Sequence, residues 1–245
     1  MRFTSELHLD DGTTEREFTI GDVPGIFWMP ATIAPPAPVP VILMGHPGGL
    51  RRMHARLAAR ARDSAAQGFA TATIDLPGSG QRPTIAAADQ ARADLRQAIM
   101  AGEQPSEEVI DQLILPLVEQ AVPEWRAALD ALLALPMLGP RVGFSGGVAA
   151  IGVRMALVEP RIVAAGIFAG SFVPRSIIEE ARQVTIPLHV LLQWDDQGND
   201  RQRALELFDA FGSREKTLQA NLGGHTGVPE FAGEDAARFF ARHLS

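Results

Sequence analysis

A serine stands between glycines in the segment GFSGG at residues 143–147. It follows a short apolar run and precedes a small-residue run that can form a helix, so the sequence predicts a strand, a tight turn and a helix. A turn of this pattern is a nucleophile elbow, which holds its serine in a strained backbone conformation. Glycine is needed on both sides of Ser145, because strand and helix cross closely there. The segment therefore predicts Ser145 as a nucleophile, the alternative being a glycine-rich turn that contains a serine by chance.

A pair of acids and a histidine follow later apolar runs. Asp195 and Asp196 come at the end of the run at 188–194, and His225 comes after the run at 216–221. In an open α/β sheet, functional groups gather where the strands end. A serine hydroxyl needs a base such as imidazole to take its proton, and the imidazole needs a carboxylate to fix its tautomer. The chain order serine, acid, histidine therefore predicts a catalytic triad.

The elements that position these groups alternate between buried strands and helices. An antiparallel opening is expected at residues 2–29, and an irregular connection at 31–40. Beyond it, the order strand, helix, strand predicts a largely parallel, doubly wound sheet in an α/β fold, with one domain over 1–245. The expected strands are 41–44, 69–74, a strand leading into the serine, 162–168, 188–194 and 216–221. The expected helices are 50–67, 85–101, 107–122, 125–135, one from the serine to 157, 174–183, 200–211 and 230–244.

The segment at 84–122 holds more helix than one crossover connection requires. Because it precedes the serine strand, it should lie over the strand ends, and we expect it to form a lid or cap over the site. The alternative is a solvated helical excursion that contacts no ligand. Pro123 is expected to separate this insertion from a crossover helix at 125–135.

Composition and charge narrow the class of protein. The chain has 245 residues, 46% of them hydrophobic and 21% charged, which suits one globular core. Its formal net charge of −7 argues against nucleic acid and anionic membrane surfaces as partners. The absence of cysteine excludes disulfides and a thiolate nucleophile. The N-terminus lacks an apolar signal segment and no apolar run is long enough to span a bilayer, so a soluble, cytoplasmic protein is expected.

Taken in order, these motifs make the chain similar to the α/β-hydrolase superfamily, and within it to the dienelactone-hydrolase and small-esterase branches. The resemblance runs from residue 41 to the C-terminus. It rests on GHPGG at 45–49, DLPGSG at 75–80, the GFSGG segment, the Asp195–Asp196 pair and the Gly224–His225 pair. It implies an α/β-hydrolase fold with N-terminal antiparallel strands and a helical lid insertion.

The resemblance implies a role for each catalytic group. Ser145 would be the nucleophile and His225 the general base, with Asp196 rather than Asp195 as the acid. Members of the superfamily often carry Gly-x-x-Asp at the acid turn, and Gln193 stands here in place of that glycine. The choice between the two aspartates therefore stays open at this point.

The oxyanion hole would be formed by the backbone N–H groups of Gly146 and Gly48, with Gly49 as the alternative to Gly48. Pro47 has no N–H and is excluded. His46, beside this loop, would contact substrate or hydrogen-bond the loop backbone. The other expected substrate-binding residues are Trp194, Leu113 and Leu117.

These roles predict a cofactor-independent serine hydrolase that cleaves a carboxylic ester, lactone or thioester through an acyl-enzyme. The substrate would be a small and largely apolar molecule. Alternatives are lyases, perhydrolases or C–C bond hydrolases on the same fold, and a ligand-binding protein without turnover. The quaternary state is left open, with a homodimer as one possibility.

Neither a metal nor a nucleotide is expected. No pair of histidines has metal-ligand spacing with carboxylate support, and His54, on a helix among arginines, is expected to face solvent. Gly78-x-Gly80 resembles part of a phosphate cradle, but no dinucleotide fingerprint and no P-loop lysine accompany it.

Overall fold

The computed structural model describes residues 1–30 and 38–245, apart from the side chain of residue 87. The predicted irregular connection at 31–40 lies largely outside the described residues. One nine-stranded sheet runs through the molecule in the order β1-β2-β3-β5-β4-β6-β7-β8-β9. The strands are β1 Arg2–His8, β2 Thr14–Ile20, β3 Val23–Met29, β4 Val39–Gly45, β5 Ala70–Ile74, β6 Leu138–Gly146, β7 Ile162–Phe168, β8 Leu188–Gln193 and β9 Lys216–Asn221.

The sheet has an antiparallel and a parallel part. β1, β2 and β3 pair antiparallel with their neighbours, including the pairing of β3 with β5. The pairings from β5 through β4 and β6 to β9 are all parallel. This confirms the predicted antiparallel opening and parallel body. The carboxyl ends of β4 to β9 therefore meet at one edge of the molecule, where loops can combine into a site.

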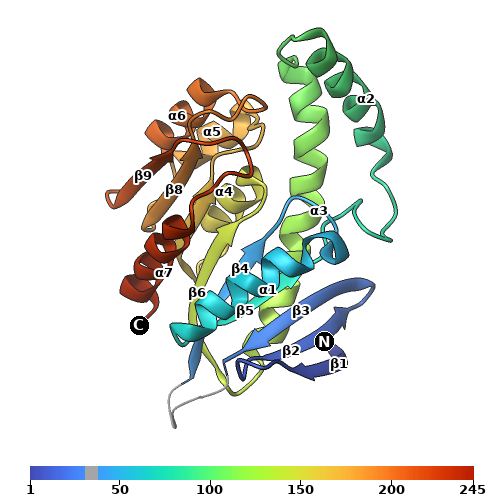
Figure 1. Cartoon of the computed structure of the whole chain (residues 1–245). Coiled ribbons are helices and arrows are strands. Elements are labelled where there is room, and N and C mark those ends of the chain that lie inside the picture. Colours follow the sequence, from blue (N-terminus) through green and yellow to red (C-terminus); the bar gives the residue numbers. More distant parts are fainter. Residues whose placement is uncertain (31–37) are drawn as a thin grey trace.

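Helices cover both faces of the sheet (Figure 1). They are α1 Leu50–Ala66, α2 Ala86–Ala101, α3 Glu107–Leu133, α4 Ala149–Val158, α5 Arg175–Ala181, α6 Arg201–Ala210 and α7 Glu230–Leu244. Side chains of α3 to α6 pack into the larger core on one face, and those of α1 and α7 form a smaller core on the other. Burial of both faces explains why the parallel strands read as continuous apolar runs. None of the described helices is long and apolar enough to cross a membrane.

Helix α3 is one helix of 27 residues, although Pro116 and Pro123 lie inside it. The prediction of two helices divided at Pro123 is therefore wrong. A proline removes a backbone hydrogen bond and crowds the preceding turn, which favours a break. Here the buried positions continue at helical spacing past both prolines, from Ile110 to Leu132, and pack into the larger core. Tertiary packing outweighs the local cost.

The insertion predicted at 84–122 corresponds to α2 and the first half of α3. The two helices pack along each other and extend beyond the sheet in the view of Figure 1. At the far end of α2, the side chains of Ile99 and Met100 are exposed. The role of this hairpin as a lid stays a prediction.

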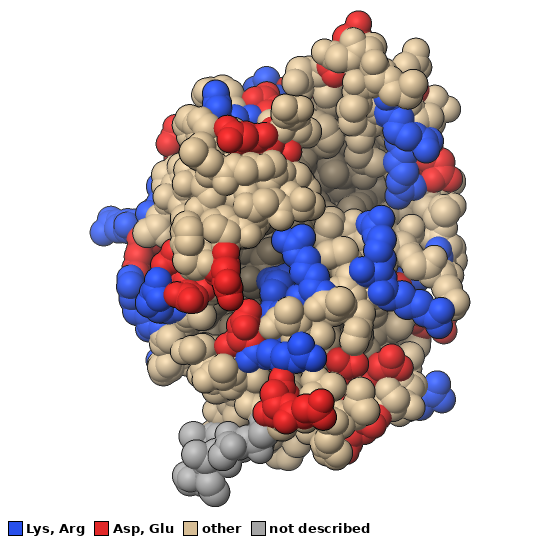
Figure 2. Space-filling view, viewed as in Figure 1, with Lys and Arg blue, Asp and Glu red and all other residues tan. Residues whose placement is uncertain are grey.

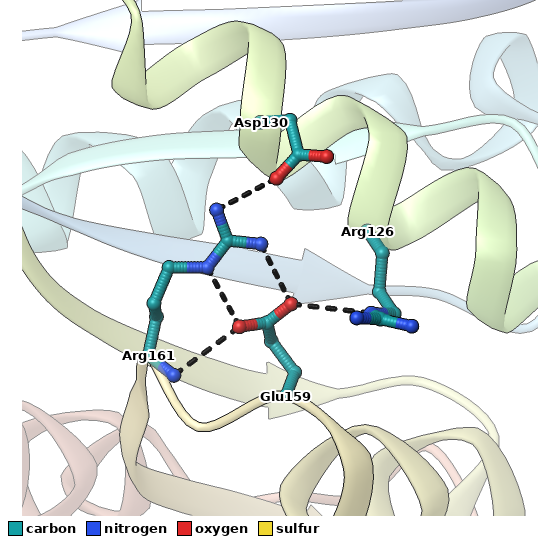
Figure 3. A network of polar contacts seen from close by, with 4 residues as sticks. All are labelled: Arg126, Asp130, Glu159 and Arg161. Atoms are coloured by element: carbon teal, nitrogen blue, oxygen red, sulfur yellow. Dashed lines mark hydrogen bonds and ion pairs between the residues drawn. The ribbon is translucent and has the colours of Figure 1, made fainter.

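A network of charged side chains ties α3 to the connection between α4 and β7 (Figure 3). Glu159, 1% exposed, accepts hydrogen bonds from Arg161 Nε at 2.6 Å and from Arg161 Nη2 at 2.7 Å. Arg126 Nε lies 3.4 Å from the same carboxylate, and Asp130 Oδ1 lies 2.7 Å from Arg161 Nη1. The hydrogen bonds from Arg161 are the main reason that the pKa of Glu159 lies below its usual value. Because the network precedes β7, it lies at the amino ends of the strands and serves stability.

Candidate active site

His225 and Asp196 come together beyond the ends of β8 and β9. Nδ1 of His225 lies 2.7 Å from Oδ2 of Asp196, and Oδ1 of Asp196 accepts a hydrogen bond from the Gly198 N–H at 3.1 Å. The Asp196 side chain is 3% exposed, and that of His225 is 50% exposed. A carboxylate only accepts, so it holds the Nδ1–H tautomer and leaves Nε2 of the half-exposed ring as the proton acceptor. The aspartate that contacts the histidine is Asp196 and not Asp195.

Gln193 joins the two loops that carry this pair. Its Nε2 donates to the Gly224 carbonyl at 3.1 Å, and its Oε1 accepts from Asn221 Nδ2 at 3.4 Å. The side chain is buried. Phe168, at the end of β7, packs edge to face against the His225 ring, with the centroids 5.4 Å apart. The glutamine that replaces the expected glycine therefore holds the histidine loop against β8.

Ser145 is the second-last residue of strand β6 and lies directly before the turn rather than at its apex. It pairs with Met44 of β4 and with Gly166 of β7. Its Oγ accepts a hydrogen bond from Arg60 Nη2 at 3.0 Å, and its carbonyl accepts from the same nitrogen at 3.1 Å. Since Arg60 belongs to α1, the Ser145 side chain points to the sheet face that α1 and α7 cover. Among the described residues, no hydrogen bond joins Ser145 to His225.

The turn between β6 and α4 falls later in the chain than the GFSGG pattern indicates. Gly146 and Gly147 have φ angles of 76° and 79°, and α4 begins at Ala149 with Val148 as its N-cap. Within residues 1–30 and 38–245, a positive φ occurs only at glycine. The strained conformation predicted for Ser145 is therefore absent. The strained positions carry no side chain, and the next residue is a valine, so the turn offers no hydroxyl.

Arg60 is a charged residue that sequence reasoning missed. Its guanidinium donates to the Gly45 carbonyl as well as to Ser145, and no carboxylate of the described residues forms an ion pair with it. Burial, followed by repulsion from Arg56, lowers the pKa of Arg60 to about 10, so the group stays charged at neutral pH. The position of Arg60 in its helix was a signal for this role. It directly precedes Ala61, which is fully buried, so Arg60 borders the face that α1 turns to the sheet.

A second carboxylate–histidine contact lies on the side of α1. Glu15 of β2 is 8% exposed and accepts hydrogen bonds from Trp28 Nε1 at 2.7 Å and from His54 Nε2 at 2.9 Å. The prediction that His54 faces solvent is therefore only half right, since its ring is partly exposed but tied to a buried acid. No spacing in the sequence links residues this far apart.

The loop after β4 is anchored by His46. Its Nε2–H donates to the Ile74 carbonyl at 2.9 Å, and its Nδ1 faces the Gly48 N–H at 3.4 Å. The ring is 1% exposed, and burial lowers its pKa, so it is a neutral imidazole. Both ring nitrogens are engaged inside the protein, which makes His46 a loop anchor and leaves no atom for the expected substrate contact. The oxyanion roles of Gly48 and Gly146 stay predictions.

The other expected substrate-binding residues lie in two places. Trp194 is 39% exposed beside the acid turn, and the Arg201 guanidinium carbon lies 4.4 Å from its ring centroid. Leu113 and Leu117 of α3 are partly buried against the larger core. Leu117 also lines a groove on the α1 side of the molecule. Substrate contacts of these three residues stay predictions.

Solved structures of esterases match the chain over its whole length. No protein-family model matches it, and no curated protein does. A cold-adapted esterase from an Arctic intertidal metagenomic library, in a PEG-bound complex, matches with a TM-score of 0.75 and 25% sequence identity over 100% of both chains. An acetyl xylan esterase from Paenibacillus sp. R4 matches with a TM-score of 0.65 and 14% identity, over 99% of this chain and 88% of that one. An esterase of Pyrococcus furiosus matches with a TM-score of 0.62 and 11% identity, over 100% and 93%.

Proposed function

This chain is related to the α/β-hydrolase superfamily, and we propose that it hydrolyses a carboxylic ester of a small molecule. The observation that carries the proposal is the 2.7 Å contact between His225 and Asp196 at the carboxyl ends of β8 and β9. A buried carboxylate that orients a half-exposed imidazole provides a general base near neutral pH. The structural neighbours are esterases, which supports ester hydrolysis as the class of reaction.

In the arrangement described, His225 acts on a water molecule. Its Nε2 takes a proton from the water while the water oxygen attacks the ester carbonyl carbon, which gives a tetrahedral oxyanion. Asp196 keeps the Nδ1–H bond and stabilises the imidazolium. The intermediate then expels the alcohol oxygen, which takes the proton from Nε2, and the acid is released. The N–H groups of Gly146 and Gly48 are the proposed donors to the oxyanion, and for Gly48 this requires its N–H to leave His46 Nδ1, which lies 3.4 Å away.

A second route keeps Ser145 as the nucleophile of an acyl-enzyme. The GFSGG segment favours it, because it places a serine between glycines directly before α4. On this route Ser145 Oγ leaves Arg60, gives its proton to His225 and attacks the carbonyl; the alcohol departs, and a water activated by His225 releases the acid.

The experiment that tests the proposal compares wild type, His225→Ala and Ser145→Ala in two assays. The first is turnover of p-nitrophenyl acetate and butyrate. The second is intact mass after exposure to a fluorophosphonate, which labels an activated serine. Circular dichroism on all three proteins controls for folding.

The two routes predict different outcomes. On both, His225→Ala loses about 10²–10⁴-fold in kcat/KM, the range that a general base contributes. On the water route, Ser145→Ala stays close to the wild-type rate, and wild type gains no adduct. On the serine route, wild type gains one adduct that Ser145→Ala lacks. A folded wild type that turns over no ester, or a His225→Ala variant with the wild-type rate, would overturn the proposed function.

A further inference from the structure

A large groove opens on the α1 side of the molecule, apart from the proposed catalytic pair. It has a volume of about 1180 Å³ and runs from β1–β3 across the start of α1 to α2. Two loops form part of its wall, residues 47–49 after β4 and residues 75–81 after β5. In Figure 2, Lys and Arg side chains gather in a band over α1 and α2, next to the hollowed part of this face.

The two loops meet as a platform of glycine backbone. They approach so closely that a Cβ on Gly49 would lie 3.0 Å from the Gly80 nitrogen. Gly78 and Gly80 have φ angles of 70° and 62°, which other residues rarely adopt. In the described part of the chain, the N–H groups of these three glycines have no hydrogen-bond acceptor. Backbone N–H groups gathered in this way form concavities that bind anions.

Guanidinium groups stand over the platform. A side chain at Gly48 would collide with the Arg52 guanidinium, and a Cβ on Gly78 would lie 3.6 Å from Arg92 Nη2. Arg51 lines the same groove. Arg92 pairs with Asp89 at 2.8 Å on the surface of α2, whereas Arg51 and Arg52 form no ion pair with a carboxylate of the described residues.

The carboxylates of the groove do not neutralise these arginines. Asp75 accepts hydrogen bonds from the Leu50 N–H at 3.0 Å and from Ser79 Oγ at 2.8 Å, within the loops themselves. Glu15 is buried and holds His54, as described above. Glu17 is exposed, but it belongs to the wall that β1–β3 form. Three arginines and one carboxylate therefore lie at the platform: Arg51, Arg52 and Arg92, and Asp75, whose Oδ2 would lie 2.5 Å from a Cβ on Gly80.

We infer that the platform binds the oxyanion head group of an amphiphilic organic anion, a carboxylate or a phosphate on an apolar body. Arginine forks and backbone N–H groups are the donors that such head groups need. The apolar body lies along the apolar wall of the groove. That wall includes Phe18, Ile26, Leu76 and Leu117. The inferred site goes beyond ester hydrolysis, since binding there requires neither His225 nor a reaction.

The inference also explains the GSG stretch at 78–80, which looked like an incomplete phosphate cradle in the sequence. A P-loop supplies its lysine from the helix that follows the loop. Here the cations come from the start of α1 and from the middle of α2, which only the fold brings to the same loops.

Calorimetric titration of the full chain with three probes tests the site. The probes are hexanoate, hexyl phosphate and hexanol, and the variants are Arg52→Gln and Arg92→Gln. Arg201→Gln is the matched control, because it removes an exposed guanidinium that stacks on Trp194 beside the acid turn. We expect at least one anion to bind and hexanol not to. Each groove variant should weaken the Kd about tenfold, the effect of one charge-assisted hydrogen bond, and the control should not.

The three probes distinguish the possible results of the titration. Preference for hexyl phosphate assigns a phosphate head group, and preference for hexanoate assigns a carboxylate. Hexanol that binds as tightly as the anions would overturn the site, because the groove would then be merely apolar. Unchanged affinity in both groove variants, or no binding of either anion, would overturn it as well. Repeating the titration with His225→Ala, which should bind normally, keeps this result distinct from failure of the proposed hydrolysis.

Discussion

Replacement of Asp196 by asparagine tests the acid–histidine pair without changing the shape of the side chain. Oδ1 of Asp196 accepts from the Gly198 N–H at 3.1 Å, and Oδ2 accepts from His225 Nδ1–H at 2.7 Å. Asparagine has one oxygen, and the backbone N–H can only donate, so the amide oxygen stays with Gly198 and the NH2 group faces Nδ1. Nδ1 must then accept, which places the imidazole proton on Nε2. In that tautomer His225 cannot take a proton from water or from serine.

The loss should be large for the reaction and small for the fold. With the wrong tautomer, kcat/KM falls about 10³–10⁴-fold, equal to about 4–5.5 kcal/mol of transition-state stabilisation. The free energy of unfolding falls by about 1–3 kcal/mol, the contribution of a hydrogen bond to a charged group. Asp195→Asn is the matched control, because it removes the same charge from an exposed neighbouring side chain.

The assay is the pH dependence of kcat/KM for p-nitrophenyl acetate, with circular dichroism and urea unfolding on each variant. Asp196→Asn should remain folded and lose activity across the pH range, whereas Asp195→Asn should resemble wild type. A larger loss in Asp195→Asn would reassign the acid. An Asp196→Asn variant within tenfold of wild type, a limit well below the expected loss, would refute the tautomer reasoning.

Two further predictions concern stability. Glu159→Gln should lower the free energy of unfolding by about 2 kcal/mol at pH 7 in urea, because it removes hydrogen bonds between a buried carboxylate and Arg161. Since the folded-state pKa of Glu159 lies below the usual value of 4.5, this stabilisation is present above pH 4.5 and is lost as the pH falls through the folded-state value. A gap between the two proteins that widens as the pH falls below 4.5 would contradict this sign. Gly147→Ala should lower the free energy of unfolding by well over the about 1–2 kcal/mol of a strained φ, because its Cβ would also lie 2.8 Å from the Gly45 carbonyl carbon. Gly68→Ala is the comparison: its φ is 82° and its Cβ would have nothing within 4 Å, so it should cost the strain alone. Equal thermal shifts in these two glycine variants would show that the close approach of β4 and the turn is not rigid.

Most of the fold could be predicted from the sequence, because strands buried on both faces are continuous apolar runs. The strands at 162–168 and 216–221 and the helix at 230–244 have the predicted bounds. Helix α3 could not be predicted as one helix, because the local effect of Pro123 argues for a break. Its continuity depends on a buried face that packs against distant strands, which no local window contains.

The candidate site also has a part that could be predicted from the sequence and a part that could not. His225 and Asp196 could be predicted because each lies in a loop directly after a strand, so their meeting follows from strand order alone. The place of Ser145 depends on where β6 ends, and the pattern does not contain that information. Any of the neighbouring glycines could begin the turn. Pairing of Gly146 with Gly45 of β4 extends the strand past the serine and moves the turn onward.

This extension of β6 bears directly on the route to hydrolysis. Ser145 is the second-last residue of β6, and rotation about its own side-chain bonds does not carry its hydroxyl to the other face of the sheet. Ser145 is paired with Met44 and Gly166, so a movement of the end of β6 toward His225 would break this pairing. The charged Arg60 would lose one of its acceptors, which costs about 1–3 kcal/mol for a buried donor. Water that approaches the half-exposed imidazole requires none of these changes. On the proposed water route the histidine–aspartate pair therefore acts without Ser145, and an adduct on Ser145 is the observation that would favour the serine route.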